Sequence, residues 1–138
     1  MRIINDQKIY RVIDANFNRA KEGLRVEEDI CRFYLDQKIL SRHFKNIRHR
    51  LTDIIIALRL PRLIQARDIQ KDVGKASTAS EIKRAQVGDI FLANSQRVKE
   101  SIRVLEEFTK LLNKNLATDL KKIRYQCYAL EKKVAAKL

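Results

Sequence analysis

A fifteen-residue segment near the start of the chain recurs near its end, and this repeat constrains the fold more than any other feature. ANFNRAKEGLRVEED (residues 15–29) and ANSQRVKESIRVLEE (residues 93–107) are identical at eight of fifteen positions. After a two-residue deletion, LSRHFKNIRHR aligns with LATDLKKIRYQ, which brings Arg48 onto Arg124. Two related segments of this length predict two copies of one supersecondary unit, packed about a pseudo-twofold axis.

Apolar residues recur with helical spacing in both copies. The spacing predicts four main helices, at about residues 6–35, 38–60, 89–112 and 116–136. Pro61 is expected to end the second helix because it lacks a backbone donor, and Asp89 is expected to cap the third. The predicted fold is therefore all-α: an antiparallel helical bundle of two pseudo-twofold-related hairpins.

We expect a single domain over residues 1–138, because a chain of this length usually forms one core. Its parts would be the first hairpin, a connecting loop with a short helix, and the second hairpin, at about residues 6–60, 61–87 and 88–138. Thr78 and Glu81 fit a capping box, which predicts a short helix ending near Val87. The long polar connection before it exceeds what a bundle needs and is more often functional than idle.

The composition excludes several other classes of protein. The longest apolar run, Ile54–Leu58, is too short to span a membrane, and the first residues lack the apolar stretch of a signal peptide, so we expect a cytoplasmic protein. Cys31 and Cys127 have no zinc or disulfide spacing and are predicted to be buried thiols. One Pro and three Gly leave no glycine-rich phosphate loop.

The formal net charge of +13 predicts an anionic partner. Charge alone leaves nucleic acid, a membrane surface and small phosphorylated metabolites open. The basic residues are spread along the sequence among acidic ones, which is also typical of a solvated helical surface.

Helical geometry indicates which repeated residues are unusual. Asn16 and Arg19, and their copies Asn94 and Arg97, fall within the arc that should be buried. Burying an unpaired guanidinium costs several kcal/mol, so partners are required. One interpretation is a salt-bridge network in which Glu22 and Glu100 fix how the hairpins dock. The other is a pocket on the axis where the guanidinium groups hold phosphate oxygens.

The opposite side of the first helix carries Lys21, Arg25, Glu28 and Arg32. These side chains are expected to lie away from the core and to pair with neighbours one turn along the helix. On this geometry Arg25 and Arg103 are weaker site candidates.

The runs IDANFNRAKEGLRVEEDICRFYLD, FKNIRHRL, QARDIQKDVG, LANSQRVKESIRVLEEF and IRYQCYALE resemble, in that order, the N-terminal domain ahead of the barrel in some fused thiamine phosphate synthases. That family is similar to a second type of hydroxymethylpyrimidine phosphate kinase. The resemblance implies ATP-dependent phosphorylation of hydroxymethylpyrimidine phosphate to the diphosphate for thiamine synthesis, with Mg²⁺ accompanying ATP. The synthase barrel is absent from this chain, so we do not expect the synthase reaction.

On this hypothesis Arg19 and Arg97 bind phosphates, while Asn16 and Asn94 orient the pyrimidine or a phosphate. Phosphoryl transfer mainly needs positive groups that position substrates and spread the developing charge. Further anion ligands would be Arg48, Arg67 and Arg124.

Asp72 is the candidate for holding Mg²⁺ or orienting the acceptor, and Gly74 would allow close backbone approach. Glu22 and Glu100, like Glu28 and Glu106, are weaker metal candidates, since each could equally hold an arginine. The family often has hydroxyl residues directly after the equivalent of Arg67, and this chain lacks them.

Other functions remain open. The chain could be a noncatalytic domain that docks to a separate thiamine phosphate synthase, or a basic nucleic-acid-binding module. Against the second, aromatic residues are few and do not alternate with basic residues on an exposed face. A di-metal carboxylate bundle is disfavoured because Glu-x-x-His pairs are absent and only His43 and His49 are present. A homodimer is also open.

Overall fold

The chain forms a helical bundle in a computed structural model that describes residues 6–79 and 83–138. The described elements are α1 (Asp6–Asp29), the π-helical segment η1 (Ile30–Tyr34), α2 (Lys38–Ala57), α3 (Leu60–Ala66), α5 (Val87–Thr109) and α6 (Lys114–Ala135). No strand occurs in this part of the chain. The all-α prediction is confirmed.

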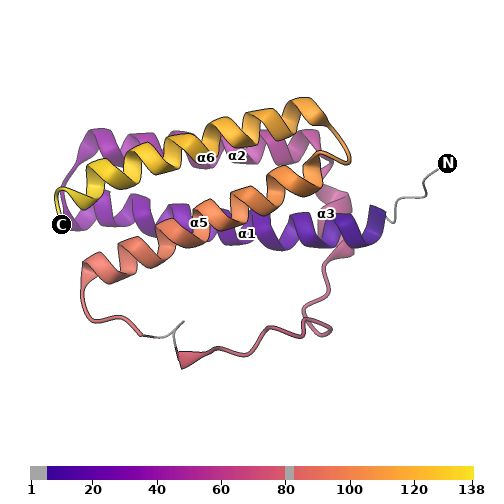
Figure 1. Ribbon diagram of the computed structural model, residues 1–138, viewed down its shortest axis with the longest axis horizontal. Helices are drawn as coiled ribbons and strands as arrows, with labels where there is room; N and C mark the ends of the chain where they lie inside the picture. The colour runs from indigo at the N-terminus through magenta and orange to yellow at the C-terminus, as the bar shows by residue number, and fades with distance from the viewer. Residues whose placement is uncertain (1–5, 80–82) are drawn as a thin grey trace.

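The long helices lie in two layers (Figure 1). Helices α1 and α5 cross side by side and antiparallel in one layer, and α2 and α6 form the other. The described parts of the segment that joins the two hairpins, residues 67–79 and 83–86, run along the outer side of the α1–α5 layer. Among the described helices, none combines the length and the apolar character that crossing a bilayer requires.

The apolar stripes of all four long helices meet between the layers. Phe44 of α2 and Phe91 of α5 are fully buried and pack edge to face, with ring centroids 6.4 Å apart. Each such side chain contributes about 1.5–3 kcal/mol by leaving water. Cys31 and Cys127 are buried free thiols, as predicted.

The prediction that Pro61 ends the second helix is wrong. Helix α2 ends earlier, at Ala57, and Arg59 adopts a left-handed conformation with φ 66°. Pro61 then lies in the first turn of α3, where a missing backbone donor costs nothing because those donors have no partner within the helix. The short helix α3 was not predicted.

The start of α5 also differs from the prediction. Gln86, not Asp89, is the N-cap, and Asp89 closes a reciprocal capping box in which its Oδ2 accepts from the Gln86 N–H at 3.0 Å. The short helix predicted from Thr78 depends partly on residues 80–82, which lie outside the described residues. Residues 83–86 are not helical.

A buried arginine–glutamate pair at equivalent positions joins the helices of each hairpin, and in the second hairpin Lys99 of α5 also pairs with Glu131 of α6 at 2.6 Å. Arg48 of α2 donates to Glu28 of α1, with Nη2 and Oε1 3.0 Å apart, and the repeated residues Arg124 and Glu106 pair in the same way between α6 and α5. Glu28 is only 3 % exposed, so the prediction that it faces away from the core is wrong. The second layer covers that side of α1. Removing one partner of such a pair typically costs about 3–5 kcal/mol.

Helices α1 and α5 cross closely because residue 23 is glycine. A Cβ at Gly23 would lie 2.6 Å from Cγ2 of Val98 and 3.1 Å from the backbone oxygen of Asn94. The equivalent position in the second repeat is Ser101, which is 3 % exposed. The crossing therefore tolerates only the smallest side chains.

We predict that Gly23→Ala destabilises the protein by about 1–3 kcal/mol, although alanine is the better helix former. The reason is that the Asn94 carbonyl belongs to the backbone and cannot move cheaply. Urea denaturation followed by circular dichroism measures the change. Gly88→Ala is the matched control, because nothing lies within 4 Å of a Cβ there, and it should be neutral or slightly stabilising. Equal effects at the two positions would contradict the packing argument.

One carboxyl group in the core, that of Glu27, is only partly compensated, by the nearby Ser95 hydroxyl and the charge of Lys99. Glu27 is 1 % exposed, and its Oε1 has no hydrogen-bond partner among the described residues. Burial, and then the charge of Glu131, raises the pKa of this carboxyl well above 4.5. Glu27 therefore stays protonated to a higher pH in the folded than in the unfolded chain.

This difference predicts a pH-dependent stability. The contribution of protonated Glu27 to the free energy of unfolding is fully present below 4.5, the pKa of the carboxyl in the unfolded chain. This contribution is lost as the pH rises through the higher pKa of the folded chain. Glu27→Gln removes the titration, so its free energy of unfolding relative to wild type should increase from pH 4.5 upward. Urea denaturation at several pH values measures this.

Glu107→Gln provides the opposite control. Glu107 is exposed, and hydrogen bonding to Lys110 lowers its pKa, so its contribution is present above the unfolded pKa and lost as pH falls. Glu107→Gln should lose stability relative to wild type as pH rises. The same slope for both variants would contradict the assignment of Glu27.

Candidate functional site

Two adjoining cavities lie along the α1–α5 layer, on the side where the connecting segment passes. The loop cavity, about 770 Å³, is lined by α1 together with residues of the 67–72 segment. The amide cavity, about 450 Å³, is lined by α1 and α5 together with Arg84 of the connecting segment. Asn16, Arg19 and Arg97 line both. The repeat therefore brings three of its four singled-out residues to the boundary between the two cavities, and the fourth, Asn94, lines the amide cavity.

The two asparagines are held identically. Nδ2 of Asn16 donates to the carbonyl of Val12 at 2.9 Å, and Nδ2 of Asn94 donates to the carbonyl of Ile90 at 2.8 Å. Each bond reaches back one turn on its own helix. It fixes the amide, so that Oδ1 is the atom left to accept from a ligand.

Arg19 and Arg97 are exposed, so the prediction that they are buried is wrong. They lie on the side of α1 and α5 that faces away from α2 and α6, and no further helix layer covers that side in the part of the chain that the structure describes. Nη1 of Arg19 lies 3.5 Å from Oδ1 of Asn16, and Arg97 makes no hydrogen bond or ion pair with the residues the structure describes. Both guanidinium groups keep donors available for an anion.

The salt-bridge interpretation of these arginines is not supported. Neither Glu22 nor Glu100 forms an ion pair with the arginine three residues before it, within the described ranges. Glu100 instead accepts from Nε2 of Gln96, with Oε1 at 2.9 Å. Glu22 lines the loop cavity and Glu100 the amide cavity.

Asp14, which was not among the predicted site residues, is a buried carboxylate that positions the loop. Asp14 is 3 % exposed and accepts two hydrogen bonds from Arg67, at 2.8 Å from Nε and 2.7 Å from Nη2. The hydrogen bond and then the charge of Asp14 raise the pKa of Arg67. Arg11 adds a bond from Nη2 to the carbonyl of Asp68 at 3.0 Å. Together these contacts hold the start of the connecting segment against α1.

The loop places Asp72 at the loop cavity, but Gly74 does not line either cavity. The Gly74 N–H donates to Oδ1 of Asp72 at 2.9 Å, which fixes that carboxylate within its own turn. Asp68 and Glu22 line the same cavity. The described residues contain no group of three or more potential metal ligands. Dispersed carboxylates of this kind fit Mg²⁺, which usually takes one or two carboxylates and fills its shell with phosphates and water.

Arg48 and Arg124 lie outside both cavities, and their predicted role as anion ligands remains a prediction. Their guanidinium groups are engaged by Glu28 and Glu106 in the buried pairs described above. Arg124 also lines a separate cavity of about 320 Å³.

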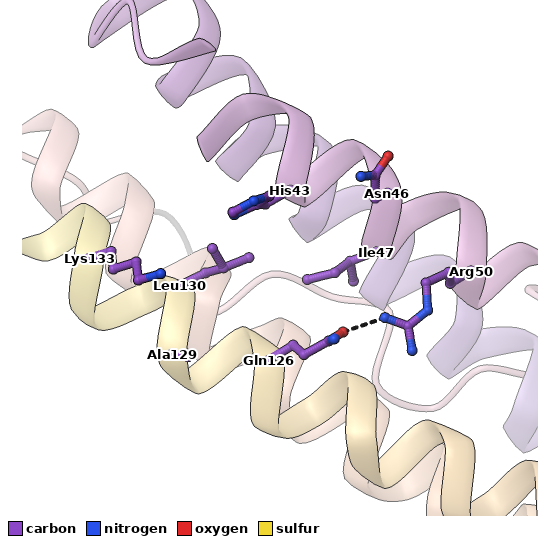
Figure 2. Close-up of a pocket in the computed structure, with 8 residues that line it drawn as sticks. All are labelled: His43, Asn46, Ile47, Arg50, Gln126, Ala129, Leu130 and Lys133. Atoms are coloured by element: carbon purple, nitrogen blue, oxygen red, sulfur yellow. Dashed lines mark hydrogen bonds between the residues drawn. The ribbon is translucent and has the colours of Figure 1, made fainter. Parts of the chain in front are cut away.

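A further cavity of about 370 Å³ lies in the other layer, between α2 and α6 (Figure 2). Nη1 of Arg50 donates to Oε1 of Gln126 at 2.6 Å and bridges the two helices. His43 and Lys133 also line it, together with the apolar side chains of Ile47 and Leu130. None of the predicted site residues lies there, so the α1–α5 cleft is the candidate site.

Comparison with known proteins places the chain in a family. The ThiD2 family profile matches residues 11–133. The chain is 42% identical to the thiamine-phosphate synthase of Nostoc punctiforme over 91% of its length, 38% identical to that of Rhodopirellula baltica over 94%, and 42% identical to that of Synechocystis sp. over 89%. It spans 35% of the length of each of these relatives. No solved structure is significantly similar. The chain therefore belongs to the ThiD2 family.

Proposed function

We propose that this chain uses ATP to phosphorylate hydroxymethylpyrimidine phosphate to the diphosphate, as a step of thiamine biosynthesis. The observation that supports this most directly is the pair Arg19 and Arg97. They come from equivalent positions of the two repeats, line the boundary of two cavities and carry no carboxylate partner among the described residues. Relatives that contain the matched region are thiamine-phosphate synthases.

The proposed reaction joins two phosphates. A phosphate oxygen of the pyrimidine substrate attacks the γ-phosphorus of ATP, the bond from that phosphorus to the β–γ bridging oxygen breaks, and ADP leaves. The products are ADP and the pyrimidine diphosphate. Because both reactants are anionic, positive groups at the meeting point are the main requirement.

The residues of the cleft can meet this requirement. Arg19 and Arg97 would hold the two reacting phosphates against their repulsion and stabilise the charge that develops on the transferred group. Asn16 and Asn94 would accept hydrogen bonds from the pyrimidine through Oδ1. Asp72 would hold the Mg²⁺ that accompanies ATP, and the ion would offset part of the triphosphate charge.

A docking function is the second candidate. It is favoured by how little of each relative the chain matches, because the chain spans only 35% of the length of proteins named as synthases. On this alternative the domain binds the remaining part of such a protein and catalyses nothing.

A coupled assay separates the two candidates. Purified chain, ATP, Mg²⁺ and hydroxymethylpyrimidine phosphate are combined, and the product is supplied to a separate thiamine phosphate synthase with its second substrate. Thiamine phosphate should form only when ATP and hydroxymethylpyrimidine phosphate are both present. No product, with the chain folded by circular dichroism, would contradict the kinase proposal.

Arg97→Ala should lower kcat/KM about a hundredfold or more, because a donor to the transition state is lost. The helical circular dichroism signal should remain, since Arg97 is exposed. Arg103→Ala is the matched control: Arg103 follows in the same helix, is also exposed and pairs with Glu107 outside both cavities. Its kcat/KM should change by less than about threefold. Equal losses in the two variants would contradict the assignment.

A further inference from the structure

The two halves of the cleft are not equivalent, although the repeats are. Asp14 of the first repeat is buried and clamps Arg67, which brings the connecting segment onto the α1 half. The equivalent position in the second repeat is Leu92, which is 48% exposed and provides no carboxylate. The symmetry is therefore broken by one side chain and by the loop that it holds.

The loop cavity has the chemistry of a polyphosphate site. Arg11 and Arg67 join the two shared arginines around it, and Arg67 remains 44% exposed beside its carboxylate partner. Asp68 and Asp72 add carboxylates to the same wall. Guanidinium groups with one or two carboxylates nearby suit a triphosphate that carries Mg²⁺. This cavity is also the larger of the two, at about 770 against 450 Å³.

The amide cavity has the chemistry of a site for a small phosphorylated heterocycle. Arg84 lines it beside the two shared arginines and can meet a phosphate, while side-chain amides line the rest of the wall. Asn94 and Gln96 line it, and in each the amide nitrogen donates one bond within the helix, which orients the amide and leaves its oxygen as an acceptor. Ser101 is a further polar group on the wall. Amide oxygens suit the exocyclic amino group of a pyrimidine, and they would add little to the binding of a polyphosphate.

We infer that the two cavities take different substrates: the nucleoside triphosphate lies in the loop cavity and the pyrimidine phosphate in the amide cavity, with their reacting phosphates meeting at Arg19 and Arg97. This assignment rests on the proposed kinase function. Asp14 is then a positioning residue, which acts through Arg67 and does not touch a substrate.

Direct binding tests the assignment without turnover. Isothermal titration calorimetry measures the Kd of the non-hydrolysable analogue AMP-PNP with Mg²⁺, and separately that of hydroxymethylpyrimidine phosphate. Arg67→Ala should weaken the nucleotide analogue about tenfold and leave the pyrimidine phosphate within about twofold. Asn94→Ala should do the reverse. Arg103→Ala, outside both cavities, should change neither.

Arg67→Ala leaves the buried Asp14 carboxylate unpaired and can destabilise the fold. Asp72→Asn, which is isosteric and exposed, is the second loop-cavity variant, and it should weaken only the nucleotide analogue. If loop-cavity variants weaken the pyrimidine phosphate instead, or both ligands equally, the assignment is overturned while the kinase function stands. If wild type binds neither ligand, the proposed function fails, and the assignment fails with it.

Discussion

The close crossing of α1 and α5 at Gly23 is the constraint on which the rest of the structure depends. With Val98 and the Asn94 carbonyl within contact of any Cβ at this position, the helices can approach only because no side chain intervenes. The crossing brings equivalent stretches of the two repeats together in antiparallel orientation. Arg19 and Arg97 thereby reach the same cavities from different helices.

The arginines of the repeat divide into two groups with different physical roles. Arg48 and Arg124 are neutralised by buried glutamates and tie the second layer to the first, so they contribute to the fold. Arg19 and Arg97 are exposed and have no carboxylate partner among the described residues. Part of the net charge of +13 is therefore concentrated at one cleft, as two guanidinium groups without a carboxylate partner among the described residues. Positive charge gathered in a cleft attracts anions.

Much of the fold could be predicted from the sequence because it follows from local patterns. The apolar periodicity predicted the four long helices, and the repeat predicted their pairing. The burial of Glu28 and the exposure of Arg19 could not be predicted from one helix, because both depend on which side the second layer covers. The sequence of one helix gives the angular position of each side chain around the helix axis. Which of these positions are buried depends on where the neighbouring helices pack.

The candidate site, like the fold, could be predicted from local patterns only in part. Six of the eleven candidate residues line the loop cavity, and two more line only the amide cavity. Asp14 was missed because its partner Arg67 lies 53 residues away, and no local pattern joins them. Pro61 was misplaced because the same missing donor that ends one helix is tolerated at the start of the next.

The central claim is that Arg19 and Arg97, from the two repeats, act on substrate phosphates at one place. A double-mutant cycle on the affinity for hydroxymethylpyrimidine phosphate tests it most directly, using Arg19→Ala, Arg97→Ala and the double variant. The account predicts that the losses are not additive, with a coupling energy of about 0.5–3 kcal/mol, because both groups share one ligand. Losses that add within about 0.5 kcal/mol would show that the two arginines act independently and would contradict the account.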